Sequence, residues 1–202
     1  MQRSDLAFRA KVGAIVALWF AGVYGGADLL MRGTTDLASV WSPWDERLPF
    51  WPSWALVYLS VTPFLCLPLL VMPDRLSLKV LALVLMIETL IAGIVFVIYP
   101  VSAPLLADGP LPALFRLADR INLDLNNLPS LHVALTVTTF LALRPLLGRA
   151  GLPVTLWATA ICLSTLLTRQ HDLASCAAGL ALAAIGHWGI APLVRRGFAG
   201  PG

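Results

Sequence analysis

The chain contains apolar runs that are long enough to cross a lipid bilayer, and this feature limits its fold more than any other. The hydrocarbon core is about 30 Å thick and a helix rises about 1.5 Å per residue, so one crossing needs about 20 residues. Six segments have roughly this length: 12–31, 52–72, 78–99, 129–147, 152–169 and 172–194. Because lipid offers no hydrogen-bond partners, such runs must be helical. We predict an all-α integral membrane protein, a six-helix transmembrane bundle that forms one domain over residues 1–202.

The composition excludes several other classes of protein. Of the 202 residues, 58% are hydrophobic and 12% are charged, and the mean hydropathy is +0.82. A soluble globule or a disordered chain needs far more polar residues. The formal net charge of +3 is small and scattered, so we expect no nucleic-acid partner. The three cysteines lie in apolar stretches without CxxC spacing, and we therefore expect buried thiols, no metal and no cofactor.

Basic residues predict the orientation in the membrane. Six spans place both termini on one side, and positive charges favour the cytoplasmic side. With cytoplasmic termini, nine basic residues lie inside: Arg3, Arg9, Lys11, Arg75, Lys79, Arg144, Arg149, Arg195 and Arg196. Five lie outside: Arg32, Arg47, Arg116, Arg120 and Arg169. The short chain and compact loops favour a bacterial inner membrane, with the loops 32–51 and 100–128 facing outward.

The two outer loops contain features typical of a membrane surface. Trp41, Trp44, Trp51 and Trp54 cluster where the first of these loops meets the second span, and we interpret them as interfacial anchors. Residues 111–120 place their apolar side chains on one helical face. We predict a short interfacial helix there, ahead of span four.

Two of the three histidines occupy the outward ends of predicted spans. His132 lies in the first turn of span four and His171 at the start of span six. Both spans run inward, so both helix N-termini, with their unpaired N–H groups, open on the same face. Ser130 adds a hydroxyl and Arg169 a guanidinium suited to phosphate. The pattern predicts an anion site with two imidazoles.

Such a site could perform phosphoryl transfer without a metal. One imidazole would attack phosphorus while the other protonates the leaving oxygen, since histidine titrates near neutral pH. Spacing alone leaves an alternative open, in which the two are unrelated histidines at a polar boundary.

Two motifs resemble those of a known family. PSLH at 129–132 and ST-x-x-T-R-Q-H at 164–171 are similar to the second and third motifs of the type 2 phosphatidic acid phosphatase superfamily, in the branch similar to inositol phosphorylceramide synthases. Asp45, Tyr58 and Asn126 fit the pattern more loosely. The likeness extends from about residue 45 to residue 180.

The resemblance implies a six-helix bundle and a phosphohistidine intermediate. His171 would be the nucleophile, and His132 the general acid that later becomes the base. Ser130 and Arg169 would hold phosphate oxygens. Thr165 stands where many relatives carry an arginine and is a further phosphate-binding candidate.

Two positions depart from the family pattern. Ser175 stands where relatives carry an aspartate that holds the nucleophilic ring; its hydroxyl can accept the ring N–H but supplies no charge. We therefore count Ser175 as a catalytic candidate. Relatives read P-R-P after span three, whereas this chain reads APLL at 103–106. Arg120, or Arg116, would fill that gap as a phosphate ligand, and a solvated or headgroup-facing role is the alternative.

The expected function is that of a membrane lipid phosphatase or phosphotransferase, acting on a lipid phosphate or phosphodiester in the bilayer. Transfer to water gives a phosphatase, and transfer to an alcohol acceptor gives a synthase. The alternative is a catalytically degenerate protein that binds or transports a lipid phosphate. Ser175 favours this alternative, while the retention of both histidines opposes it.

Four other features carry expectations. Glu88 lies in mid-span, where an acid is costly, and we favour a hydrogen-bonded link between helices over a proton relay. His187 is expected to be structural. Asp28 either reaches the site or caps its helix. Pro63 and Pro68 are expected to kink span two.

Overall fold

The structure is a computed structural model that describes residues 3–102, 111–123 and 125–199. In chain order the helices are α1 (Arg3–Met31), α2 (Pro43–Glu46), η1 (Pro52–Trp54), α3 (Ala55–Leu59), α4 (Val61–Val71), α5 (Arg75–Ile98), α6 (Ala113–Ile121), α7 (Leu131–Leu143), η2 (Arg144–Leu146), η3 (Gly148–Ala150), α8 (Gly151–Leu167), α9 (Leu173–Ala184), η4 (Ile185–Ile190) and α10 (Ala191–Ala199). The described residues form no β-strand. The prediction of an all-α protein is confirmed.

Five helical segments are long and apolar enough to cross a membrane. They are Ser4–Met31, Pro52–Val71, Arg75–Ile98, Gly148–Leu167 and Leu173–Phe198. They coincide with five of the six predicted spans. The chain is therefore consistent with an integral membrane protein, since each segment reaches the length that a crossing requires.

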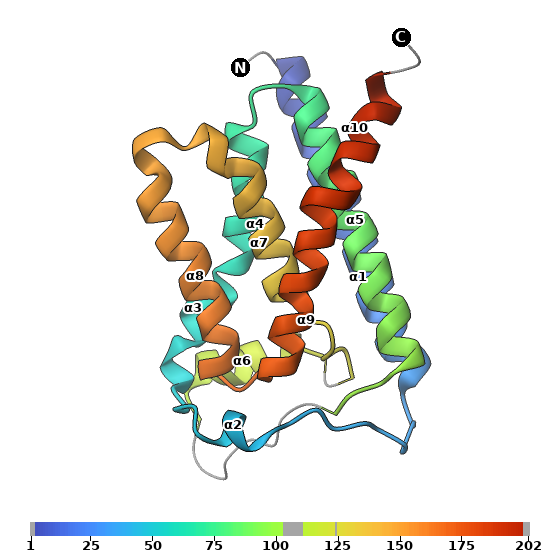
Figure 1. Cartoon of the computed structure of the whole chain (residues 1–202), viewed down its shortest axis with the longest axis vertical. Helices are drawn as coiled ribbons and strands as arrows, with labels where there is room; N and C mark the ends of the chain where they lie inside the picture. The colour runs from blue at the N-terminus through green and yellow to red at the C-terminus, as the bar shows by residue number, and fades with distance from the viewer. Residues whose placement is uncertain (1–2, 103–110, 124, 200–202) are drawn as a thin grey trace.

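The remaining predicted span is a shorter apolar helix, Leu131–Leu146, formed by α7 and η2. α7 packs against α4, α5, α8 and α9 and buries most of its residues. Figure 1 shows it between α8 and α9. Because other helices cover it on several sides, α7 forms the centre of the bundle.

The bundle has two distinct ends. Figure 1 shows the start of α1 and the end of α10 at one end, which we call the terminal end. α2 and α6 lie at the other, together with the starts of α7 and α9, and we call it the α6 end (Figure 1). Isolated bridges join Ala38 to Val101 and Val101 to Asn126. They hold the segment that enters α7 against the connections that follow α1 and α5.

Proline explains the break in the second span. α3 ends at Leu59 and α4 begins at Val61. Pro63 has no N–H to bond the carbonyl of Leu59, and its ring crowds that carbonyl. Ser60 occupies the break, where its hydroxyl donates to the Val57 carbonyl at 2.6 Å and accepts from the Trp157 indole at 2.8 Å. The second span is thus interrupted one turn before Pro63, whereas Pro68 lies inside α4 without ending it.

Glu88 links two helices in the core. It is fully buried on α5, and the Thr138 hydroxyl of α7 donates to its Oε1 at 2.6 Å. Gly186 of η4 lies so close that a Cβ there would overlap the same carboxyl group. The expected hydrogen-bonded link between helices is confirmed.

Gly179 allows α9 to approach the start of α7. A Cβ at this position would lie 2.5 Å from the Ser130 carbonyl oxygen and 3.1 Å from the Val133 Cβ. The backbone oxygen cannot move aside by rotating a side chain. We expect Gly179→Ala to destabilise the fold by about 1–3 kcal/mol, as overpacking does. The melting temperature in detergent measures it. Gly22→Ala on α1, where a Cβ meets open space, is the control, and equal losses at both positions would contradict the prediction.

Candidate phosphoryl-transfer site

The two predicted histidines meet at the α6 end. His132 lies in the first turn of α7, and His171 lies in the turn between α8 and α9. Their ring centroids are 5.8 Å apart and their planes are inclined by 55°. The predicted convergence of the two imidazoles is confirmed.

The turn that carries His171 folds back onto the end of α8. The N–H groups of Gln170 and His171 both donate to the carbonyl oxygen of Thr165, at 3.0 and 3.1 Å. Arg169 has a φ of 52°, in the left-handed region. Glycine is the usual residue where a helix ends in this way, because a Cβ costs about 1–2 kcal/mol there. An arginine at this position points to a role for its side chain.

Asn127 determines which nitrogen of His171 carries the proton. Nδ1 of His171 lies 2.8 Å from Oδ1 of Asn127 and 3.1 Å from its carbonyl oxygen. Both oxygens accept hydrogen bonds, so Nδ1 must be the protonated nitrogen of the neutral ring. Nε2 then holds the lone pair. It is buried and has no partner among the described residues, so it is free to act as a nucleophile.

Asn127 is itself fixed on its other side. Its Nδ2 donates to the carbonyl oxygen of Ser102 at 3.1 Å and lies 3.4 Å from Oδ2 of Asp172. Because Nδ2 faces two acceptors, Oδ1 is the atom turned toward His171. The Asp172 carboxylate is thus linked to the His171 imidazole through the side-chain amide of Asn127.

His132 has a different partner. Tyr58 of α3 stacks on its ring with centroids 4.1 Å apart, and the phenol oxygen lies 3.3 Å from Nδ1 of His132. Tyr58 is buried and His132 half-buried. As an imidazolium, His132 donates its Nδ1–H to the phenol oxygen and keeps the Nε2 proton for transfer, which leaves a neutral ring with its lone pair on Nε2. This arrangement suits a general acid.

The N-terminus of α7 keeps free donors. Ser130 is its N-cap, and the Ser130 hydroxyl accepts from the Val133 amide at 3.4 Å. The amides of Leu131 and His132 have no acceptor among the described residues. These groups carry the positive end of the helix dipole, so an anion beside His132 is favoured.

The N-terminus of α9 differs from the prediction. The Leu173 amide donates to Oδ1 of Asp45, and the Ser175 amide to Oδ1 of Asp172, each at 2.7 Å. The expectation that α9 presents unpaired N–H groups to phosphate is therefore wrong at these two positions. The sequence could not show this for Asp45, which approaches from 128 residues away.

The hydroxyl groups of two candidates, Ser175 and Thr165, bond to groups other than the histidines. The Ser175 hydroxyl donates to Oδ2 of Asp172 at 2.9 Å, while Asn127 holds the His171 ring. The Thr165 hydroxyl donates to the Cys162 carbonyl and lies 3.2 Å from the Cys176 sulfur. Thr165 acts on the site through its carbonyl oxygen, which shapes the turn that carries His171.

The arginine candidates are placed differently from one another. Arg120 is exposed on α6 and makes no contact with the histidines among the described residues. The Arg169 guanidinium lies 5.7 Å from the ring centre of Trp41 and 5.5 Å from that of Phe50. Its Nε is buried without a partner in the described part of the chain. A guanidinium held between two rings without a carboxylate can bind an anion.

Several other predictions are resolved by these contacts. Trp41 packs on Arg169, whereas Trp44 and Trp51 are exposed as expected of anchors. Asp28, near the end of α1, pairs with Arg32 directly after that helix. The APLL segment lies outside the described residues.

Burial lowers the pKa of His171 to about 4, against a weaker opposing effect of its hydrogen bond to Asn127. His171 is only 2% exposed, and with this lowered pKa its ring is neutral at pH 7. In the unfolded chain it titrates near 6.5. Between these values the unfolded state binds the proton first, so stability should fall with falling pH, by up to about 1.4 kcal/mol per unit. Melting temperatures from pH 7 to 4 measure this. His171→Asn should flatten the dependence, and an unchanged slope would contradict it.

Asn127, the partner of His171 Nδ1, is a residue of the candidate site that sequence reasoning did not single out. Asn126 was noted as a loose match to the family pattern, but it donates to the Tyr24 carbonyl instead. The available signal was a pair of polar amides directly ahead of an apolar span, where a buried side chain needs a partner.

The described residues contain no group of three or more His, Cys, Asp or Glu side chains that could hold a metal ion. No protein-family model matches the chain, and no curated protein or solved structure matches it. The assignment to the phosphatase superfamily therefore remains a prediction from the two motifs.

Proposed function

We propose that this chain is a membrane lipid phosphatase or phosphotransferase that acts through a phosphohistidine on His171. The observation that carries the proposal is the pair of imidazoles, whose ring centroids are 5.8 Å apart and whose Nδ1 atoms have different partners, Asn127 for His171 and Tyr58 for His132. His171 presents an unpartnered Nε2 that holds a lone pair. His132 meets a phenol through its Nδ1, and in its imidazolium form it holds the Nε2 proton that it donates.

The chemistry divides into two balanced steps. Nε2 of His171 attacks phosphorus, and the bond from phosphorus to the leaving oxygen breaks. The electron pair stays on that oxygen, which takes the Nε2 proton of the His132 imidazolium and leaves the His132 ring neutral. Water or an alcohol then attacks phosphorus, His132 takes the proton of the attacking hydroxyl, and the P–N bond breaks to restore His171. Arg169 and the first amides of α7 stabilise the charge on phosphorus.

The proposal includes six crossings, with α7 as the short central one. Leu131–Leu146 has 16 residues, about 24 Å of helix. Its neighbours cover it, so it need not match the full thickness of the hydrocarbon. α6 would lie in the membrane interface on the outer side. The terminal end would face the cytoplasm of a bacterial inner membrane, which agrees with its excess of basic residues.

A second candidate is binding or transport of a lipid phosphate without turnover. It is favoured by burial, because His171 is 2% exposed while His132 and Arg169 are half-buried. An anion could rest on His132 and Arg169 without reaching Nε2 of His171. The carboxylates of Asp45 and Asp172 accept hydrogen bonds from amides at the start of α9, so these amides do not bind a phosphate near His171. This also favours binding without turnover.

Trapping the phosphoenzyme tests the main proposal. Detergent-purified protein without added metal is mixed with a ³²P-labelled lipid phosphate, such as phosphatidic acid, and quenched in alkaline detergent because phosphohistidine is acid-labile. We expect label on the protein that maps to His171 and disappears on a chase with unlabelled lipid. Bound but unreacted lipid, with no covalent label and no phosphate release, would favour the binding candidate.

Asn127 should contribute more to the rate than Ser175. Asn127→Leu removes the Oδ1 acceptor, but the backbone carbonyl at 3.1 Å still favours the same tautomer. We expect a loss of about 10- to 100-fold in kcat, the usual effect of removing a group that orients a catalytic ring. Ser175→Ala is the matched control and should cost much less, because its hydroxyl bonds to Asp172. Phosphate release measures both, and a larger loss for Ser175→Ala would contradict the assignment.

A further inference from the structure

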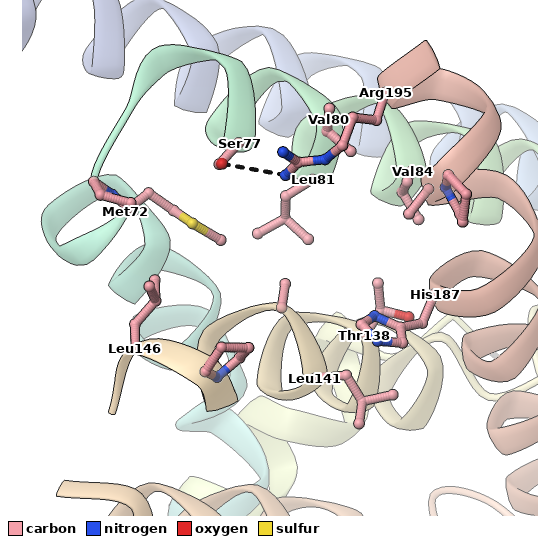
Figure 2. A pocket seen from close by; sticks show the side chains of 15 residues that line it. Met72, Ser77, Val80, Leu81, Val84, Thr138, Leu141, Leu146, His187 and Arg195 are labelled. Carbon is pink, nitrogen blue, oxygen red and sulfur yellow. Dashed lines mark hydrogen bonds between the residues drawn. The ribbon is translucent and has the colours of Figure 1, made fainter. Parts of the chain in front are cut away.

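One feature that the proposed function leaves unused is a cavity at the terminal end. It has a volume of about 420 Å³ and lies among α5, α7 and the η4–α10 segment. Its walls are mostly apolar and include Met72, Leu81, Val84, Leu141, Leu146 and Pro192. Figure 2 shows these walls around an open interior. The volume is within the range of small-molecule sites, about 300–1,000 Å³.

Polar groups on the walls are few. Thr138 and His187 lie together on one side, and Thr138 also holds the buried Glu88. Ser77 and Arg195 lie on the other side, where the Arg195 guanidinium donates to the Ser77 hydroxyl at 3.3 Å (Figure 2). The cavity therefore has the character of an amphiphile site, an apolar interior with a cation beside it.

Arg195 keeps donors for an anion. The described residues give it no direct ion pair. Arg195 interacts electrostatically with Asp74, whose carboxylate is already held by the Ser77 amide at 2.7 Å and hydroxyl at 2.8 Å. Ser77 thus stands between the two charges. A guanidinium has five N–H donors, and Ser77 receives a bond from one of its nitrogens.

The surroundings add positive charge. Lys79 lies near the rings of Phe8 and Phe198, and Arg75 lies over Phe8 at the same end. Arg196 follows directly on α10 and is exposed. Basic pockets between membrane helices on the cytoplasmic side bind anionic lipid headgroups.

We propose that this cavity binds one acyl chain of an anionic membrane lipid, with the lipid phosphate at Arg195. The occupant follows from two properties, the apolar interior among candidate membrane helices and the cation at its edge. The lipid belongs to the leaflet at the terminal end, opposite the histidine pair. The proposal goes beyond phosphoryl transfer and holds whether or not His171 is catalytic.

Lipid titration followed by native mass spectrometry tests the headgroup part. The probes are dioleoylphosphatidylglycerol and dioleoylphosphatidylcholine, which share acyl chains and differ in net charge. Both lipids carry a phosphate, and the trimethylammonium of phosphatidylcholine offsets its charge and is repelled by Arg195, so we expect wild type to bind the anionic lipid about tenfold more tightly, about 1.4 kcal/mol. Arg195→Gln should abolish the preference, and the identical change in Arg196→Gln should retain it. A preference that survives Arg195→Gln, or that both variants lose equally, would overturn the proposal.

Filling the cavity tests the acyl-chain part. Ala142 lines the cavity, so Ala142→Phe should weaken binding of both lipids, with Ala142→Leu as a smaller filler. Ala113→Phe is the matched control, because Ala113 is exposed on α6, at the opposite end of the bundle. Melting temperatures show that each variant is folded. Folded Ala142 variants that bind both lipids as well as Ala113→Phe does would refute the site.

Discussion

Replacing His171 with alanine should abolish phosphate release and covalent labelling together. The change removes the one nitrogen in the pair that is buried, unpartnered and constrained to hold a lone pair. Loss of the nucleophile in a hydrolase costs at least about four orders of magnitude in kcat, because no other group can form the intermediate. The measurement is release of phosphate from a panel of lipid phosphates, in detergent without metal.

The third histidine supplies the control. His187 lies on η4 beside the cavity at the terminal end and contacts neither catalytic candidate among the described residues. His187→Ala should retain phosphate release close to that of wild type. If His171→Ala releases phosphate at the wild-type rate, the phosphohistidine mechanism is wrong and the binding candidate gains.

Replacing Arg169 with glycine should separate stability from function. The φ of 52° is strained for arginine and free for glycine, so the variant should be as stable as wild type or more stable by up to about 1 kcal/mol. The gain is reduced by the lost packing of the guanidinium on Trp41 and Phe50. The rate should nevertheless fall by about 10²- to 10³-fold, as it does when one donor to the reacting oxyanion is removed.

Arg169→Lys is the complementary variant. It keeps the charge and the backbone strain but loses the planar, bidentate contact, so its rate should lie between those of wild type and Arg169→Gly. Melting temperature and phosphate release are measured on the same preparations. A stable Arg169→Gly protein with full activity would show that the guanidinium does not bind the phosphate.

The architecture was largely predictable because it depends on local properties of the chain. The lengths of the apolar runs gave the helices, and Pro63 gave the break between α3 and α4. The short α7 was harder to place, because a helix enclosed by its neighbours does not need the full length that lipid requires.

The candidate site was predictable only in part. The two motifs named His132 and His171, and the alternation of spans placed them on one face. Neither motif contains Asn127, which orients His171 from 44 residues away, or Tyr58, which meets His132 from 74 residues away. Ser175 and Thr165 fit the motif spacing, but their hydroxyls bond within the α8–α9 region.

The sequence by itself determined that the chain is helical, where its apolar helices run, and which two imidazoles share an end of the bundle. Only the tertiary structure decided the hydrogen-bond partner of each ring, and it placed Asp45 on the start of α9. The reason is physical: helix formation follows from residues a few positions apart, whereas a buried polar atom bonds to whatever group the packing of distant segments brings within about 3 Å.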